Sequence, residues 1–160
     1  MRITAMENLI STAERRLLIS GDQKTSVRLV DFLGVIPAIN GKIELVYEGE
    51  QEGAEQITYH LISESIKTIF PDYFPKIEKL DKQDEDGPYD ELLRWFFENN
   101  ELILEDSLAE KEYKQTIEQV KGIESIIDMY QKDCSIEDRY FMMEFLLWGL
   151  EANKKLNKYR

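Results

Sequence analysis

Cysteine and histidine are scarce in this chain, and each occurs only once. Because Cys134 has no second cysteine to pair with, an internal disulfide is excluded, which favours a reducing, cytoplasmic location. Zinc sites usually draw on several cysteine and histidine ligands, so the same scarcity argues against a zinc site. A nucleophilic pair of Cys134 and His60 requires the two to meet in space, and we expect packing or surface roles for both instead.

Long apolar runs and basic residues are also in short supply. No stretch approaches the roughly 18 consecutive apolar residues of a membrane span. Charged residues such as Glu7 and Glu14 interrupt the first 20 residues, so we expect no signal peptide there. The 20 Lys and Arg stand against 32 Asp and Glu, which leaves a net charge of -12. Because binding to nucleic acids and anionic membranes depends on basic residues, we expect neither as a partner.

Apolar residues at helical spacing are what the chain does contain. Its 160 residues are 42% hydrophobic, enough for one ordinary domain or for two small helical units that share a core. Near the start, apolar positions alternate in steps of three and four, which predicts a helix that packs through one face. This apolar stripe consists of Ile3, Met6, Ile10, Ala13 and Leu17. A capping box of Thr4 with Glu7 predicts where the helix begins, and Gly21 where it ends.

The remainder of the first half also favours helices. Thr25 and Ser26 can cap a second helix, which Pro37 kinks or interrupts because it has no amide hydrogen. Residues 41–47 fit either a helix or a strand, and we favour the helix. Residues 57–70 predict another amphipathic helix. Residues 73–88 hold prolines and a run of acidic residues, and we place a linker there between a first unit, 1–72, and a second, 89–160.

The second unit has its own helix signals. A short helix follows Tyr89, and a capping box of Ser107 with Glu110 opens another that Gly122 breaks. Ser135 caps a last helix with an apolar stripe, for which we expect the first unit to provide cover. Aromatic and methionine side chains in this helix predict core packing rather than a cofactor pocket. The predicted fold class is all-α.

Motifs for chemistry are incomplete in this chain. Residues 21–25 look like the end of a phosphate-binding loop, but Gln23 stands where such a loop needs a glycine. A calcium loop centred on Gly87 would need oxygen ligands at Lys82 and Leu93, so that register fails. We therefore predict no metal site and no catalytic residue in this chain alone.

Two adjacent arginines in the first helix are candidates for binding something outside it. At about 100° per residue, Arg15 projects opposite the apolar stripe and Arg16 lies on its flank. Both would then be accessible. Ordinary surface charge, with Glu7 and Glu14 nearby, is the alternative that composition alone favours.

A resemblance to a known family adds to this interpretation. Residues 6–16, Met-Glu-Asn-Leu-Ile-Ser-Thr-Ala-Glu-Arg-Arg, followed by Arg28-Leu-Val-Asp31, resemble the lid region of the magnesium-chelatase and MoxR-like branch of AAA+ ATPases. Residues 36–53 resemble the segment that follows the lid in a bacterial subgroup. The resemblance covers residues 3 to about 70 well. It is weaker in the second half, where it rests on Tyr113, Gly122 and the Met143-Glu-Phe pattern.

The resemblance implies a role in nucleotide sensing. In this family the nucleotide lies between an α/β core and a helical lid, and a lid arginine contacts the γ-phosphate. By similarity, Arg16 or Arg15 would be that residue, and we prefer Arg16 because it flanks the stripe. Residues 1–72 would be the lid-like domain. The upstream core and neighbouring ring subunits would be the partners, together with any protein that the ATPase remodels.

The family's phosphate-binding loop, magnesium-binding acids and arginine finger belong to a core that these residues do not include. ATP and magnesium would bind in the full-length protein and not to this chain alone. The chain begins where the lid begins in the family, so we expect an excised piece of a longer protein, or else a separately encoded remnant. The alternative function is a free-standing, acidic helical adaptor that binds other proteins.

Overall fold

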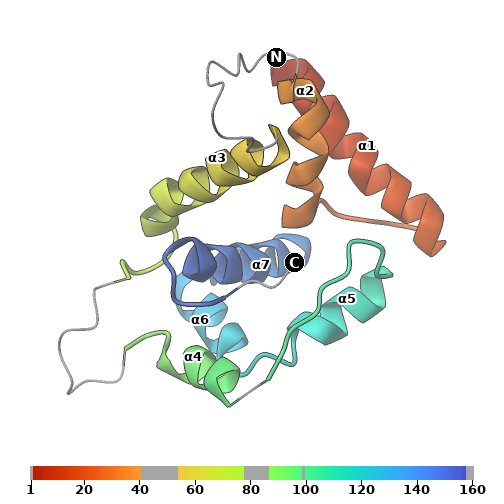
Figure 1. Cartoon of the computed structure of the whole chain (residues 1–160). Coiled ribbons are helices and arrows are strands. Elements are labelled where there is room, and N and C mark those ends of the chain that lie inside the picture. The colour runs from red at the N-terminus through yellow and green to blue at the C-terminus, as the bar shows by residue number, and fades with distance from the viewer. Residues whose placement is uncertain (1, 41–53, 78–86, 99, 158–160) are drawn as a thin grey trace.

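The computed structural model describes residues 2–40, 54–77, 87–98 and 100–157 (Figure 1). Within these ranges the chain forms seven α-helices and two 3-10 helices and contains no strand, which confirms the all-α prediction. The elements are α1 (Arg2–Ser20), η1 (Leu29–Val35), α2 (Ile36–Asn40), α3 (Ala54–Ile69), η2 (Phe70–Asp72), α4 (Asp90–Phe97), α5 (Glu110–Ile117), α6 (Ile123–Tyr130) and α7 (Ile136–Ala152). None of the described helices is both long and apolar enough to cross a bilayer.

Helix α7 lies at the centre of the molecule, where α3, α5 and α6 contact it (Figure 1). Every residue from Met142 to Leu147 is buried, so this part of α7 is enclosed on all sides rather than along one stripe. A helix buried all round is typical of a core element. The predicted packing role of its methionine and aromatic side chains is therefore confirmed.

Residues from both ends of the chain contribute to the core around α7. Leu29, Ile66 and Phe70 from the first half are buried in the same apolar cluster as Ile117, Ile127 and Leu146 from the second. The apolar stripe of α7 thus has cover from the first half. The linker predicted over residues 73–88 lies largely outside the described residues, and the predicted domain boundary remains a prediction.

Gly149 of α7 packs closely against Phe70 of η2 in the core. A Cβ atom added to Gly149 would lie 2.0 Å from Cδ2 of Phe70, whose side chain is fully buried. The Phe70 ring also lies near that of Phe145, with 6.0 Å between the centroids and a tilt of 33° between the rings. Gly149 is therefore required by space rather than by backbone conformation.

We expect Gly149→Ala to lower the free energy of unfolding by about 2 kcal/mol, the usual cost of overfilling a packed core. Urea denaturation followed by circular dichroism measures it. Combining Gly149→Ala with Phe70→Leu should cost less than the sum of the two single changes, because the smaller side chain makes room for the methyl group. Strict additivity of the two changes would show that the overlap does not decide the cost.

Helix α1 packs through a face that only partly overlaps the predicted apolar stripe, because Ala13 belongs to both. Its buried residues are Ala13 and Arg16, and Gly34 of η1 lies so close to α1 that an added Cβ would be 2.1 Å from Oγ1 of Thr12. Of the predicted stripe, Ile3, Met6 and Ile10 are 74%, 57% and 45% exposed. The Arg16–Asp31 ion pair and the close approach of Gly34 to Thr12 determine which face of α1 turns inward. The apolar stripe remains largely uncovered.

Several predicted helix starts are also corrected by the structure. Thr4 lies inside α1 rather than at its cap, and Ser26 lies in an extended segment that precedes η1. Ser107 does not cap α5, whose N-cap position is Ala109. In contrast, Ser135 caps α7 as predicted, its hydroxyl accepting the amide hydrogen of Asp138 at 3.1 Å. Gly122 lies between α5 and α6 as predicted, but α5 already ends at Ile117, and Gly122 is the N-cap residue of α6 with a φ of 81°.

The predictions for Pro37 and for residues 41–47 have different outcomes. Pro37 is the second residue of α2, where its missing amide hydrogen does no harm, and the chain changes from 3-10 to α-helix just before it. The helix favoured over residues 41–47 falls outside the described residues.

Candidate functional site: the arginines of α1 and the polar junction

Arg16 is held inside the protein by the segment that follows α1. Its Nη1 donates to Oδ1 of Asp31, and its Nη2 donates to the carbonyl of Ser26 at 2.7 Å and to the hydroxyl of Thr25 at 3.2 Å. The side chains of Arg16 and Asp31 are 4% and 1% exposed. The arginine therefore attaches α1 to η1, and the expectation that it is accessible from outside is wrong for this structure.

Asp31 also organises the start of η1. Its Oδ2 accepts the amide hydrogen of Arg28 at 2.8 Å, while the amide of Asp31 donates back to the Arg28 carbonyl at 3.1 Å. Such reciprocal bonds satisfy the amides that a helix start leaves unpaired. One carboxylate thus caps η1 and pairs with Arg16.

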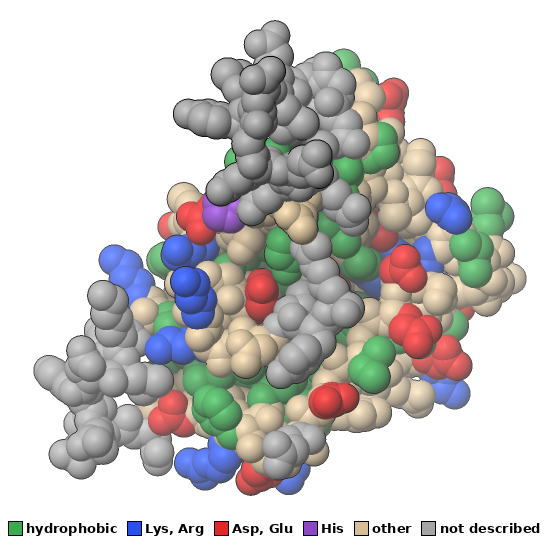
Figure 2. Space-filling model, viewed as in Figure 1, with side chains coloured by type: hydrophobic (Ala, Val, Ile, Leu, Met, Phe, Trp, Pro, Cys, Tyr) green, Lys and Arg blue, Asp and Glu red, His purple; other side chains and the backbone are tan. Residues whose placement is uncertain are grey.

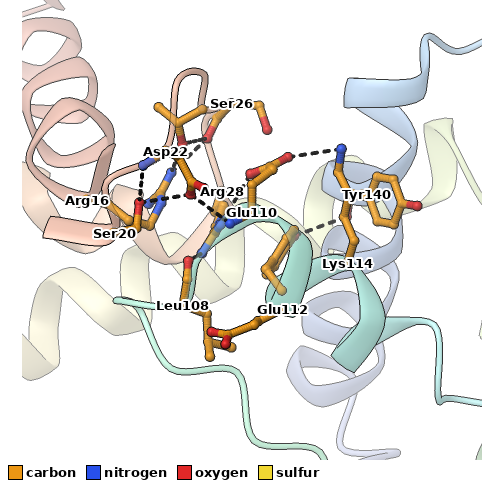
Figure 3. A network of polar contacts seen from close by, with 12 residues as sticks. Arg16, Ser20, Asp22, Ser26, Arg28, Leu108, Glu110, Glu112, Lys114 and Tyr140 are labelled. Carbon is orange, nitrogen blue, oxygen red and sulfur yellow. Dashed lines mark hydrogen bonds and ion pairs between the residues drawn. The ribbon is translucent and has the colours of Figure 1, made fainter. Parts of the chain in front are cut away.

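Arg28 connects this region to α5, far along the chain (Figure 3). Its Nη1 donates to the carbonyl of Leu108 at 2.8 Å, and its Nη2 pairs with Oε2 of Glu110 at 3.3 Å. Its guanidinium carbon lies 4.0 Å from the ring centroid of Tyr113, a cation–π contact. Arg28 is 2% exposed, so protein groups rather than solvent surround its charge, and its buried Nε has no hydrogen-bond partner among the described residues.

The loop after α1 also supplies the cap that α5 lacks in its own sequence. Oδ2 of Asp22 accepts the amide hydrogen of Glu110, the first residue of α5, at 2.8 Å, and it accepts the Ser20 hydroxyl at the same distance. These two donors hold the pKa of the Asp22 carboxyl below its usual value. A carboxylate is also favoured at this place by the positive end of the helix dipole. Asp22 replaces the predicted cap from Ser107.

Glu144 brings α7 into the same set of contacts. Its Oε2 accepts the amide hydrogen of Leu29 at 2.7 Å and the hydroxyl of Tyr113 at 3.1 Å, and the residue is 2% exposed. Burial raises the pKa of Glu144, although the two hydrogen bonds and Arg28 oppose that shift. Burial, with the Glu144 charge, also raises the pKa of Tyr113. We call the set Asp22, Arg28, Asp31, Glu110 and Glu144 the polar junction.

Arg15 differs from Arg16 in every respect that bears on ligand binding. It is exposed, and no hydrogen bond or ion pair found among the described residues involves its side chain. Its position on α1 is about 100° from that of Arg16. Of the two arginines predicted to sense nucleotide, only Arg15 can contact another molecule without a rearrangement. The sensing role itself stays a prediction.

Other candidate chemistry is dispersed. His60 is exposed on α3, and Cys134 is half-buried ahead of α7. In the part of the chain that the structure describes, no three His, Cys, Asp or Glu side chains gather where they could hold a metal ion. Hollows of about 400 Å³ and 390 Å³ lie beside α4 and α6 and beside the start of α7, and Arg15 lines neither.

The residues of the polar junction were not predicted as a group. In the sequence, Arg28 and Asp31 stand out only as part of the family resemblance, and Asp22 only as part of the turn after the first helix. A signal did exist for Glu144, since it is a single acid inside the apolar run from Met142 to Leu147. A charged residue in such a run is seldom buried without a partner, which predicts a buried polar contact.

Comparison of the chain with protein-family models, with curated proteins and with solved structures finds no match.

Proposed function

We propose that this chain is the lid and following helical region of a cytoplasmic AAA+ ATPase of the magnesium-chelatase and MoxR-like branch. In this proposal the chain completes a nucleotide site that an α/β core holds, and it contacts neighbouring subunits of a ring or a partner protein. It is inactive alone. The proposal rests on the resemblance of residues 6–16 and 28–31, and the paired arginines of α1 are the structural observation that supports it best.

The two arginines suit a lid because one of them fixes the position of the helix and the other is free to contact a ligand. Arg16 fixes α1 to η1 through the buried ion pair with Asp31, so the helix has a defined orientation. Arg15, the next residue, is exposed on that fixed helix. A guanidinium held in this way can stabilise the negative charge that spreads over a transferring phosphoryl group. The structure therefore favours Arg15 over Arg16 as the sensor arginine, which reverses the preference from the sequence.

The family's cofactors, ATP and magnesium, fit this chain only in part. The exposed Arg15 suits a phosphate group, whereas the described residues gather no acidic cluster for a magnesium ion. In the proposed protein the core supplies the phosphate-binding loop and the acids that hold the metal. This chain contributes the positive charge of Arg15 from the lid side.

The polar junction supports a further part of the proposal. Arg28, Asp22 and Glu144 connect the segment after α1 to α5 and α7 through contacts that are largely buried. In the proposed protein, a rotation of α1 would therefore carry the carboxy-terminal helices with it. Those helices are then well placed to transmit lid movement to a neighbouring subunit or a partner.

The proposal is tested by extending the reading frame upstream of Met1. A continuous frame that encodes a phosphate-binding loop is expected, and the protein expressed from it should hydrolyse ATP while the 160-residue chain alone should not. In the longer protein, Arg15→Ala should lower kcat by about 100- to 1,000-fold, as expected when one donor to the transition state is removed. Steady-state phosphate release measures the rate.

Lys24→Ala is the matched control, because Lys24 is an exposed cation in the loop just after α1. It should leave kcat unchanged, and both variants should keep the thermal stability of the parent. An unchanged kcat in Arg15→Ala would refute the sensor role. A stop codon in frame ahead of Met1, with a ribosome-binding site, would refute the ATPase proposal as a whole.

A second candidate function is the free-standing, acidic helical adaptor. The observation that favours it is the uncovered apolar stripe of α1, since exposed apolar side chains at helical spacing are typical of protein contacts. An adaptor would be functional as the 160-residue chain. The same upstream frame therefore separates the two candidates.

A further inference from the structure

The exposed face of α1 has the spacing of a coiled-coil seam. Ile3, Met6 and Ile10 are separated by three and then four residues, and all three are exposed in the folded chain. Apolar side chains are visible along the course of α1 in the space-filling view (Figure 2). Two helices that meet through residues at this spacing interlock side chain by side chain. The exposed part of the seam ends at Ile10, because Ala13 is buried and Leu17 is half-buried against the rest of the protein.

Acidic residues border this seam on its outer side. Glu7 and Glu14 are both exposed; Glu7 directly follows the seam residue Met6, and Glu14 follows Ala13, the stripe residue that is buried. In a coiled coil, charged residues at this position lie against the edge of the partner helix and select its charge. The opposite edge of the seam includes Arg16, which is turned inward to Asp31. Among the α1 side chains that the structure describes, the exposed charges that border the seam are therefore those of Glu7 and Glu14, which are negative.

Charge decides what can occupy the seam. An antiparallel second copy of this chain would place Glu7 and Glu14 against the same acidic edge, and each copy carries a net charge of -12. Like charges that face one another across a helix pair disfavour that pairing. A helix with lysine or arginine beside its apolar residues has the complementary edge.

We propose that the apolar stripe of α1 binds an amphipathic helix of a partner protein whose polar edge carries lysine or arginine. The seam lies about 140° around α1 from Arg15, as measured from Ile10 at 100° per residue. The partner therefore leaves Arg15 accessible. The inference goes beyond the proposed nucleotide sensing, and it holds whether or not that proposal does.

A synthetic peptide of leucine and lysine, with leucines at coiled-coil spacing, is the probe. Labelled with fluorescein, it should bind the 160-residue chain with a Kd on the order of micromolar in a fluorescence anisotropy titration at low salt. A twin peptide with glutamate in place of each lysine should bind at least about tenfold more weakly. The double variant Met6→Ser, Ile10→Ser should weaken binding of the lysine peptide by at least about tenfold, because it removes apolar contact area. These side chains are exposed, so the variant should keep the circular dichroism spectrum of the parent.

A charge exchange gives the sharper result. Glu7→Lys with Glu14→Lys should reverse the preference, so that the glutamate peptide binds better than the lysine peptide. The matched control, Glu105→Lys with Glu112→Lys, makes the same change in net charge at exposed residues away from α1 and should keep the preference of the parent. Phe97→Ser, which removes a 76% exposed apolar side chain from α4, should leave binding unchanged.

Three outcomes would overturn the proposal. The first is no measurable binding of the lysine peptide. The second is that the two charge changes on α1 and the two control changes weaken binding of the lysine peptide equally, which would mean that the peptide responds only to the net charge of the chain. The third is a dimer in sedimentation equilibrium that Met6→Ser, Ile10→Ser abolishes, which would make a second copy the occupant.

Discussion

Arg16→Ala is expected to lower the free energy of unfolding by about 3–5 kcal/mol, the usual cost of removing one partner from a buried ion pair. The substitution leaves Asp31, which is 1% exposed, with a buried charge whose remaining described partner is the amide of Arg28. It also leaves the Ser26 carbonyl without its donor at 2.7 Å. Guanidinium denaturation followed by the fluorescence of Trp95 and Trp148 measures the change.

The neighbouring substitution Arg15→Ala is the control for Arg16→Ala. Arg15 has the same residue type in the same helix but is exposed, so its loss should change stability by no more than about 0.5 kcal/mol. Replacing both buried partners, Arg16→Met with Asp31→Leu, should restore much of the stability lost in Arg16→Ala, because no unpaired charge remains. Equal stability of the two single variants would mean that Arg16 is not the anchor of α1.

Glu144→Ala is expected to cost about 2–5 kcal/mol, because two buried donors lose their shared acceptor and only one of them, the Tyr113 hydroxyl, has another, the Tyr140 carbonyl at 3.4 Å. These donors are the amide of Leu29 and the hydroxyl of Tyr113, which come from opposite halves of the chain. Glu144→Gln keeps an oxygen acceptor of the same shape and should cost far less at neutral pH. Thermal unfolding of the three proteins provides the comparison.

The pH dependence of the Glu144 variants has a definite sign. Burial raises the folded-state pKa of Glu144 above its unfolded value. A carboxyl with a raised pKa contributes most to stability below its unfolded pKa, and that contribution is lost as the pH rises through the folded pKa. The stability of Glu144→Gln relative to the parent should therefore increase as the pH rises from about 4, the ordinary carboxyl value. A difference that is constant across this range would show that Glu144 has an unshifted pKa.

Periodicity in the sequence was sufficient to predict most of the helices. The regular spacing in α1, α3 and α7 and the turn at Gly122 are local properties of the chain, and local properties can be inferred from sequence. Which face of α1 turns inward could not be inferred in this way. It depends on Arg16 meeting Asp31, fifteen residues away, and on Gly34 leaving room for Thr12. An ion pair and a close approach outweighed the apolar stripe.

The candidate site shows the same division between local and distant information. Arg15 is exposed as predicted, although most of the apolar stripe opposite it is uncovered as well. The burial of Arg16 could not be inferred from local sequence, because its partners lie in the next segment. The start of α5 was misplaced for a related reason: the sequence near Ser107 contains a capping pattern, but the structure takes its cap from Asp22.

A cap supplied from 88 residues away ties the growth of α5 to the closure of a long loop. A helix of eight residues is too short to be stable on its own in water. Forming its first turn fixes the backbone of several residues for only one hydrogen bond. Helix α5 should therefore consolidate late in folding, after the turn that carries Asp22 has docked. Its amides should therefore become accessible to hydrogen exchange whenever that turn undocks.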